Sequence, residues 1–175
     1  SSFMQSMIDE IEAQKELAAA ENNELRINKE IINSGELIDD IIKLYSNHEV
    51  VRGNSIVKDN SFQEVNFESD RRLLSRVLGN MLKNALEASK PESKITIGCD
   101  IDEDELEFWV HNQGHIPRNV QLQIFQRSFS TKDSTRGLGT YSIRMFSERY
   151  LQGRVRFTSS KEKGTKFYAR YPFKL

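Results

Sequence analysis

Residues 70–89 constrain the fold of this chain more than any other segment. Their apolar side chains recur at spacings of three and four, which predicts one amphipathic helix that an aspartate caps and Pro91 ends. At 3.6 residues per turn, Asn84 lies roughly 20° around this helix from Leu73, so it points where the core residues point. Asn80 lies one turn earlier, at the edge of the same arc.

The two asparagines need a physical reason. An asparagine inside a helix is about 0.7 kcal/mol less favourable than alanine, and a half-buried amide without partners costs about 1–3 kcal/mol more. One interpretation is a pair of structural amides bonded to nearby backbone. The other is a site, because an amide oxygen is a hard, neutral ligand of the kind that Mg²⁺ accepts beside phosphates and water.

Short strands and helices alternate along the rest of the chain. Periodicity and turn residues predict helices over 3–21, from a Ser34 cap to about 45, and from 139 to about 150. Strands are expected at 25–27, 55–58, 64–67, 94–99, 106–110, 155–158 and 165–171. The polar turns at 102–105 and 161–164 predict that the last four of these strands form two hairpins. This order predicts an α+β fold, a two-layer α/β sandwich whose mixed sheet is covered by helices on one face, preceded by one N-terminal helix.

Two glycine-containing motifs are candidate ligand contacts. Arg136-Gly137-Leu138-Gly139-Thr140 stands at the start of a predicted helix, where glycines let the backbone approach an anion and the first N–H groups point at it. A flexible start to the helix explains the same residues. Asn112-Gln113-Gly114 follows a strand, and its amide offers a donor and an acceptor to a base edge. The same tripeptide is also an ordinary turn signal.

Composition narrows the class of protein. The chain has 175 residues, one cysteine (Cys99) and a net charge of -1, which excludes a disulfide-stapled scaffold and argues against a general nucleic-acid binder. Residues 1–70 carry 15 acidic and 6 basic side chains, whereas residues 131–175 carry 3 and 11. The basic C-terminal third is suited to a compact anion such as a nucleotide phosphate, or it balances the acidic half.

Taken in order, these motifs resemble the ATP-binding domain of sensor histidine kinases, in the superfamily that includes the gyrase, Hsp90 and MutL ATPases. The most specific match is Asn80-Met81-Leu82-Lys83-Asn84-Ala85-Leu86-Glu87-Ala88. The resemblance implies a Bergerat-type ATP-binding fold over residues 25–175. It also implies that residues 1–22 are the end of a dimerisation and histidine-phosphotransfer helix, so that the full protein is a homodimer through this helix.

The resemblance also implies roles for single residues. Asn84 would hold Mg²⁺, Asn80 would lie beside the phosphates of ATP, and Lys83 would lie on the rim. The base would meet Asn112, Gly114 and Ile116. The other residues implied in the site are Gly137, Leu138, Gly139 and Thr140 at the phosphates, Lys132 on a lid of residues 130–135 that Phe125 and Phe129 anchor, and Gly164 and Thr165 at the adenine pocket.

Two features depart from the pattern of related kinase domains, and a third position separates the kinases from the hydrolysing members. Their turn is usually Asp-x-Gly-x-Gly, so here either Asn112 takes the aspartate position with one residue deleted, or His111 does; we prefer Asn112. Many related kinases have a basic residue where this chain has Glu87, and a carboxylate there would repel the phosphates unless Mg²⁺ intervenes. The hydrolysing members place a glutamate base where this chain has Asn80, and an amide cannot abstract a proton from water.

The sequence therefore predicts a sensor histidine kinase fragment that transfers the γ-phosphate of ATP to a histidine upstream, for relay to the receiver domain of a response regulator. A nucleotide-binding pseudokinase or scaffold and an anti-sigma-type serine kinase are the alternatives. We expect a cytoplasmic domain, which is compatible with a membrane-anchored full-length protein. No nucleic-acid partner is expected.

Overall fold

The computed structural model of the chain describes residues 2–127 and 136–175. Its central feature is a five-stranded sheet in the order β2-β4-β5-β7-β6, in which β2 and β4 are parallel and all other neighbours are antiparallel. Strands β1 and β3 form a separate antiparallel pair. The strands are β1 (Glu30–Asn33), β2 (Ser55–Lys58), β3 (Asn66–Ser69), β4 (Lys94–Asp102), β5 (Glu105–Asn112), β6 (Arg154–Ser160) and β7 (Gly164–Pro172).

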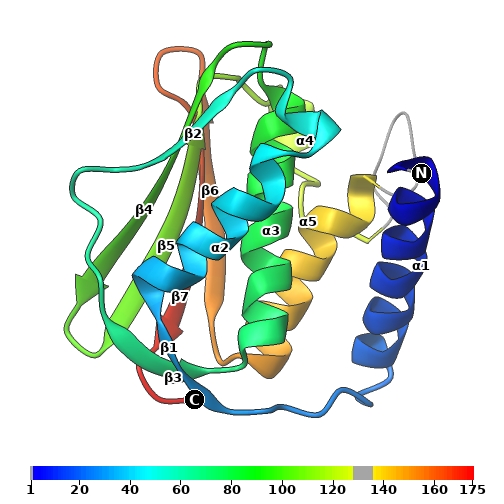
Figure 1. Ribbon diagram of the computed structural model, residues 1–175, viewed down its shortest axis with the longest axis vertical. Helices are drawn as coiled ribbons and strands as arrows, with labels where there is room; N and C mark the ends of the chain where they lie inside the picture. The colour runs from blue at the N-terminus through cyan, green and yellow to red at the C-terminus, as the bar shows by residue number, and fades with distance from the viewer. Residues whose placement is uncertain (1, 128–135) are drawn as a thin grey trace.

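The helices lie on one face of the sheet. Figure 1 shows α2, α3 and α5 side by side over this face, with α1 beyond α5. The predicted two-layer α+β sandwich is therefore confirmed. The helices are α1 (Ser2–Glu21), α2 (Ser34–Ser46), α3 (Arg71–Ala88), the short α4 (Arg118–Gln121) and α5 (Arg136–Met145), with the one-turn elements η1 (Glu49–Val51) and η2 (Phe146–Tyr150).

Helix α3 is the centre of the helical layer, and both of its ends are satisfied as the sequence predicts. The Asp70 carboxylate accepts from the Leu73 N–H at 3.0 Å and is the N-cap, while Ser89 is the C-cap. Arg52 donates to the Leu86 and Ser89 carbonyls at 2.8 and 2.6 Å, which adds side-chain hydrogen bonds to the C-terminal end of the helix. The buried arc of α3 consists of Leu73, Leu74, Val77, Leu78, Met81, Leu82, Ala85 and Leu86.

The hydrophobic core lies between this arc and the inner face of the sheet. Phe108 of β5 is fully buried there, with Phe67 and Tyr171 as ring neighbours at 6.0 and 6.5 Å. Cys99 is also buried, and burial raises the pKa of its thiol to about 12. The single cysteine is therefore a core residue of β4.

The chain before α2 differs from the prediction. Residues 25–27 are not a strand; Leu25 and Ile27 are half-buried on the core, and the following Asn28 N–H donates to Asp70 at 2.8 Å. The strand is β1, five residues later, where Ile32 is its only buried side chain among exposed or half-buried neighbours. Two residues of alternation without a pairing partner are too little to identify a strand.

Three element boundaries also differ. Asn33, not Ser34, caps α2 by accepting from the Glu36 N–H at 3.0 Å, while the Ser34 hydroxyl donates to the Gln63 carbonyl at 3.2 Å. Strand β3 is shifted toward Asp70 relative to the predicted 64–67. Helix α5 begins at Arg136, so its two glycines lie within the first turn and not before the helix. Adjacent capping residues of similar chemistry leave such shifts undetermined by sequence.

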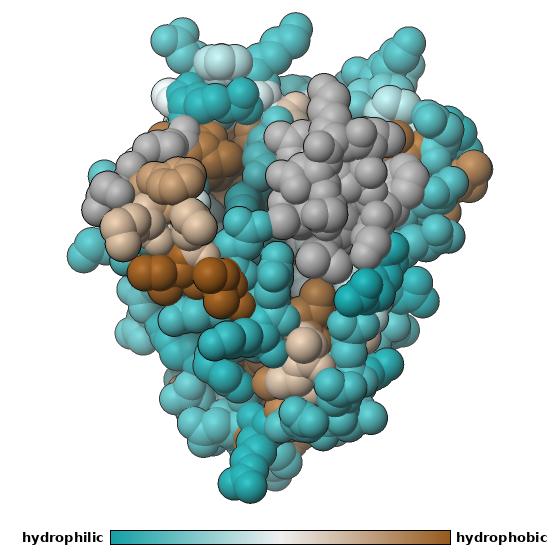
Figure 2. Space-filling model, turned by 90° about the vertical axis from the view of Figure 1, so that its right-hand side faces the viewer, coloured by the Kyte–Doolittle hydropathy of each residue, from teal (hydrophilic) through white to brown (hydrophobic). Residues whose placement is uncertain are grey.

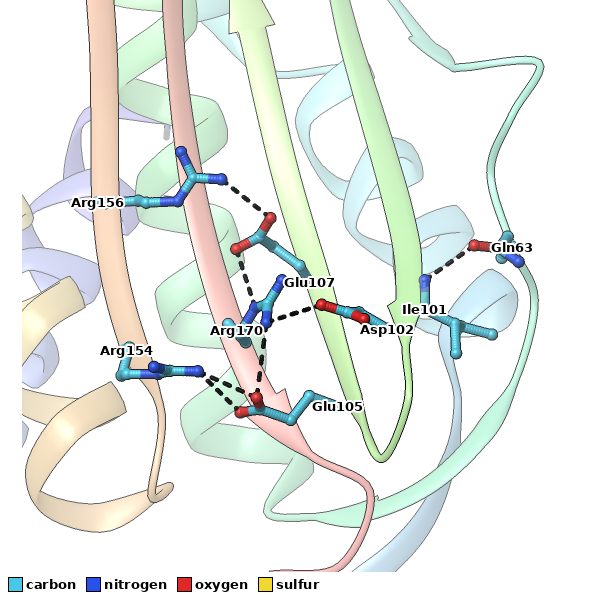
Figure 3. A network of polar contacts seen from close by, with 8 residues as sticks. All are labelled: Gln63, Ile101, Asp102, Glu105, Glu107, Arg154, Arg156 and Arg170. Atoms are coloured by element: carbon cyan, nitrogen blue, oxygen red, sulfur yellow. Dashed lines mark hydrogen bonds and ion pairs between the residues drawn. The ribbon is translucent and has the colours of Figure 1, made fainter.

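The outer face of the sheet carries a charge network instead of helices (Figure 3). Glu107 of β5 accepts from Arg156 at 3.2 Å and from Arg170 at 3.3 Å. Its side chain is only 11% exposed, so the two guanidinium groups compensate a carboxylate that is largely removed from water. We call this the outer-face network; its members are Asp102, Glu105, Glu107, Arg154, Arg156 and Arg170.

The two halves of α1 meet different surroundings. Leu17 and Ala20, near its C-terminal end, are buried against the domain, and Glu16 pairs with Arg72 and Arg76 of α3. The first half exposes an apolar stripe, which lies on the face that Figure 2 presents. The stripe consists of Phe3, Met4, Met7, Ile8 and Ile11, each between 46% and 71% exposed.

Candidate nucleotide site

One face of α3 meets three different parts of the structure. Asn80, Asn84 and Ala88 follow one another at intervals of four residues, so they lie in a row along the helix. The row is about 12 Å long at 1.5 Å per residue. Asn80 meets Ser142 of α5, Asn84 meets the first turn of α5, and Ala88 meets the turn after β5. The candidate site consists of the residues of this row and the backbone that they meet.

Asn84 faces the start of α5 with an unpaired donor. A Cβ added to Gly139 would lie 3.6 Å from Asn84 Oδ1, which places the amide beside the backbone of the first turn. Asn84 Nδ2 is buried and has no hydrogen-bond partner among the described residues. A buried donor left unpaired costs about 1–3 kcal/mol, so this position is suited to an acceptor that the protein itself does not supply.

Asn80 is bonded to α5. Its Nδ2 donates to the Ser142 hydroxyl at 2.9 Å, and that hydroxyl donates to the Gly139 carbonyl at 2.8 Å. The two bonds link the middle of α3 to the glycine turn that opens α5. Asn80 thus positions the start of α5, where the positive end of the helix dipole favours an anion.

At the end of β5, the alternation of side chains places Asn112 on the inner face of the sheet, which faces the helices. Asn112 is 2% exposed, and its Nδ2 is buried without a partner among the described residues. His111, one residue earlier, faces the opposite side, where its Nε2 lies 2.7 Å from the Lys163 carbonyl. Gly114 packs on α3 so closely that an added Cβ would lie 2.7 Å from the Ala88 carbonyl oxygen and 2.8 Å from Asn112 Nδ2.

A chain of hydrogen bonds holds this turn to the last hairpin. The Ile116 N–H donates to Ser159 Oγ at 2.8 Å, and Ser159 Oγ lies 2.8 Å from Thr165 Oγ1. Thr165 Oγ1 in turn donates to the Gly114 carbonyl at 2.8 Å. Thr165 stands directly opposite Asn112 in the β5–β7 register, and both side chains are buried.

The other predicted site residues lie around this row or outside the described residues. Lys83 is exposed on α3, and Thr140 is buried in α5. Gly137 and Leu138 lie in the first turn of α5, and Ile116 is half-buried at the turn. Lys132, Phe129 and the lid of residues 130–135 lie in the part of the chain that the structure does not describe.

Phe125 and the end of α1 border the same region. The Phe125 ring packs edge-on against Phe157 and Phe167, at 5.7 and 6.2 Å between ring centroids. Glu21 of α1 accepts from Arg127 at 2.9 Å and from the Tyr141 hydroxyl at 3.1 Å. The hydrogen bond from Arg127 lowers the pKa of Glu21, against the opposing effect of burial.

Sequence reasoning missed the supporting residues Ser142, Ser159 and Glu21. Each contacts a residue between 6 and 120 positions away, so no local pattern marks it. Ser159 and Thr165 lie opposite each other in the β6–β7 hairpin, which the sequence did predict, so this one pair was accessible from the hairpin register.

The residues fit a magnesium nucleotide better than a metal alone. The described residues contain no group of three or more His, Cys, Asp or Glu side chains that could hold a metal ion. They do contain an amide facing a helix N-terminus, with an unpaired buried donor. Mg²⁺ is commonly bound by few protein groups and mainly by phosphates and water, so an amide beside phosphates suits it.

The comparison with protein families decides the relationship. The family described as histidine kinase-, DNA gyrase B-, and HSP90-like ATPase matches residues 69–175, more than half of the chain. The chain belongs to this family. The match covers α3, both glycine motifs and the last hairpin, and it confirms the resemblance on which the predicted fold and site were based.

The curated proteins similar to this chain include a sensor protein and a kinase. The heme sensor protein HssS of Staphylococcus haemolyticus is 31% identical over 142 residues, which are 78% of this chain and 30% of that protein. Sporulation kinase A of Bacillus subtilis is 28% identical over 147 residues, 83% of this chain and 24% of that protein. The chain thus spans less than a third of the length of these relatives.

A solved member of the family has the same fold. The catalytic domain of histidine kinase ThkA superposes with a TM-score of 0.72 at 26% identity, covering 85% of this chain and 99% of that chain. ThkA has also been crystallised in complex with the response regulator protein TrrA. The superposition covers almost all of the ThkA domain, so this chain has nearly the whole fold of that domain.

Proposed function

We propose that this chain is the ATP-binding catalytic part of a sensor histidine kinase. In this proposal it transfers the γ-phosphate of ATP to a histidine on a segment N-terminal to residue 1, for relay to the receiver domain of a response regulator. The observation that carries the proposal is a pair of buried, unpaired amide donors: Asn84 on the row faces the start of α5, and Asn112 of β5 lies beside the Gly114 turn that packs on the end of the row. Family membership and the histidine kinase relatives support it.

The nucleotide would lie along the row with its base at Asn112 and Gly114 and its phosphates at Asn84 and the first turn of α5. Asn84 would hold Mg²⁺ through its side-chain oxygen, and its unpaired Nδ2 would donate to a phosphate oxygen. When bound, the metal neutralises charge on the β- and γ-phosphates. Gly137, Leu138, Gly139 and Thr140 would surround the phosphates, with Lys83 on the rim and Lys132 reaching them from the lid.

The residue that favours transfer over hydrolysis is Asn80. An amide cannot take a proton from water, and this one already donates to Ser142. Phosphoryl transfer requires mainly positioning and charge neutralisation, which the start of α5 and a bound metal supply. The acceptor would therefore be a side chain delivered to the site rather than a water molecule.

The acceptor histidine would lie outside this chain. The sequence has three histidines, His48, His111 and His115, and α1 holds none of them. His48 accepts from the Val50 N–H at 3.1 Å, and His111 lies on the outer side of β5. Neither stands beside the row on α3. A helix that precedes α1 in a longer protein is the proposed position of the phosphorylated histidine.

Partners and location follow from the same proposal. The exposed stripe on α1 would pack in a helical dimer interface of the full protein, which makes that protein a homodimer. The response regulator partner is suggested by the ThkA complex with TrrA. Among the described residues, no helix is long and apolar enough to cross a membrane. We propose that this chain is a cytoplasmic domain of a longer protein that also contains a sensor, which is compatible with a membrane anchor elsewhere in that protein.

A longer chain that includes the upstream segment tests this function. Incubation with γ-labelled ATP and Mg²⁺ should give protein-bound label that acid removes and alkali does not, as expected for phosphohistidine. The variant that replaces the upstream histidine by glutamine should stay unlabelled while it still binds ADP. Acid-stable label would indicate a serine or threonine kinase, and absence of Mg-ADP binding would indicate a scaffold; either result contradicts the proposal.

A further inference from the structure

We propose that Asn112 makes the base end of this site accept 6-oxopurines, such as hypoxanthine, as well as adenine. This inference deepens the proposed function and rests on it, because it assumes that a purine nucleotide occupies the row on α3. It concerns one property of the site: which hydrogen-bonding pattern the base must present at positions 1 and 6.

The proton on the Thr165 hydroxyl has a determined direction. The Ile116 N–H donates to Ser159 Oγ, which leaves the proton of the Ser159 hydroxyl available for Thr165 Oγ1, 2.8 Å away. The Gly114 carbonyl can only accept, so the Thr165 proton points there. Thr165 has therefore no proton left for a ligand. Toward a base it can act as an acceptor only.

Asn112 lies opposite Thr165 and offers both kinds of group. The β5–β7 register pairs the two residues, and they are 2% and 3% exposed, on the inner face of the sheet. Opposite residues of an antiparallel pair have side chains about 5 Å apart, so both reach the same base edge. Since no described residue accepts from Asn112 Nδ2, no bond from that nitrogen resists a half-turn of the amide.

The two purine classes differ in what they present to this pair. Adenine has an amino donor at position 6 and an acceptor at N1, whereas a 6-oxopurine has a carbonyl acceptor and an N1–H donor. An amide matches either pattern, in one orientation or the other, whereas a carboxylate at the same place would only accept and would repel the 6-oxo group. Thr165 favours the adenine amino group, so a preference for adenine of about tenfold or less remains.

The substitution Asn112→Asp tests the role of the amide because it replaces the side-chain NH₂ group by an oxygen and keeps the size of the side chain. Calorimetric titration with Mg-ADP and Mg-IDP gives the ratio of the dissociation constant for IDP to that for ADP. The chain as it stands should bind IDP within about tenfold of ADP, and Asn112→Asp should raise the ratio by at least about tenfold through weaker IDP binding. The exposed Asn119→Asp on α4 is the matched control and should leave the ratio unchanged.

The outcomes separate the two proposals. Tight ADP binding with IDP clearly more than about tenfold weaker in the unchanged chain would overturn this inference and leave the proposed function standing. Absence of ADP binding would overturn both. Because the ratio for the unchanged chain decides the question by itself, poor folding of the aspartate variant would not remove the test. A second variant, Thr165→Val, should weaken ADP more than IDP, and an opposite shift would contradict the argument from the proton direction.

Discussion

Two polar regions of the molecule, the row on α3 and the outer-face network, differ in how completely they satisfy themselves. In the network, every carboxylate meets a guanidinium group, and Glu107 meets two. On the row and at the turn that packs on its end, Asn84 and Asn112 each leave a buried donor without a partner among the described residues. Polar groups that satisfy one another stabilise a fold, whereas buried groups left unpaired have a cost that a ligand can offset.

A buried donor without a partner does not identify a site by itself. Trp109 Nε1 on the outer face is also buried and unpaired among the described residues, and its indole lies over Gly98, where an added Cβ would lie 1.9 Å from the ring. What distinguishes the row is that its unpaired donors adjoin a helix N-terminus and a glycine turn. A site is identified by two features together: a buried donor without a partner, and nearby backbone that can approach a ligand closely.

Removal of the Asn84 amide should have the largest effect on Mg-ADP binding. Asn84→Ala should weaken Mg-ADP binding by about 100-fold or more, since it removes a metal ligand and a donor to phosphate. The melting temperature should stay the same or rise, because the buried donor that disappears has no partner in the protein. Asn119→Ala is the surface control. Unchanged affinity in Asn84→Ala would mean that the amide is an ordinary structural residue.

Removal of a carboxylate from the network should have a smaller effect, and on a different quantity. Glu107→Ala should lower the free energy of unfolding by about 1.5–3 kcal/mol, because it removes charge-assisted hydrogen bonds to Arg156 and Arg170. Mg-ADP affinity should not change. Urea unfolding followed by circular dichroism and a calorimetric titration measure the two quantities. Glu162→Ala, in the exposed β6–β7 turn, is the control. A loss of nucleotide affinity in the Glu107 variant would remove the distinction between the regions.

The sequence predicted most of what depends on local chemistry. The caps of α3 and both hairpins were right, because Asp70, Ser89 and the polar turns act within a few residues. The row of asparagines was found because helical periodicity places Asn84 on the apolar arc. The strand at 25–27 was wrong because β1, the strand that forms instead, depends on pairing with β3. The cap of α2 was off by one residue because Asn33 and Ser34 are adjacent and similar in capping chemistry.

The sequence could not show which side chains face the site or whether their hydrogen-bond donors have partners. Asn112 and His111 were both candidates for the base-reading position, and only the strand register places one inward and the other outward. The direction of the Thr165 proton depends on Ser159 and Gly114, which reach it across the hairpin and the turn. Whether Asn84 has a partner is likewise a question of tertiary structure.

Side-chain amide resonances test the central claim most directly. Nitrogen-15 spectra resolve the NH₂ groups of Asn84 and Asn112 and the Nε–H groups of Arg156 and Arg170, each assigned by its loss in an alanine or lysine variant. Titration with Mg-ADP should shift both asparagine NH₂ groups, with saturation at one dissociation constant, and should leave both arginine signals in place. If the asparagine NH₂ signals stay unchanged at saturating nucleotide, the unpaired donors do not face the ligand and the account is contradicted.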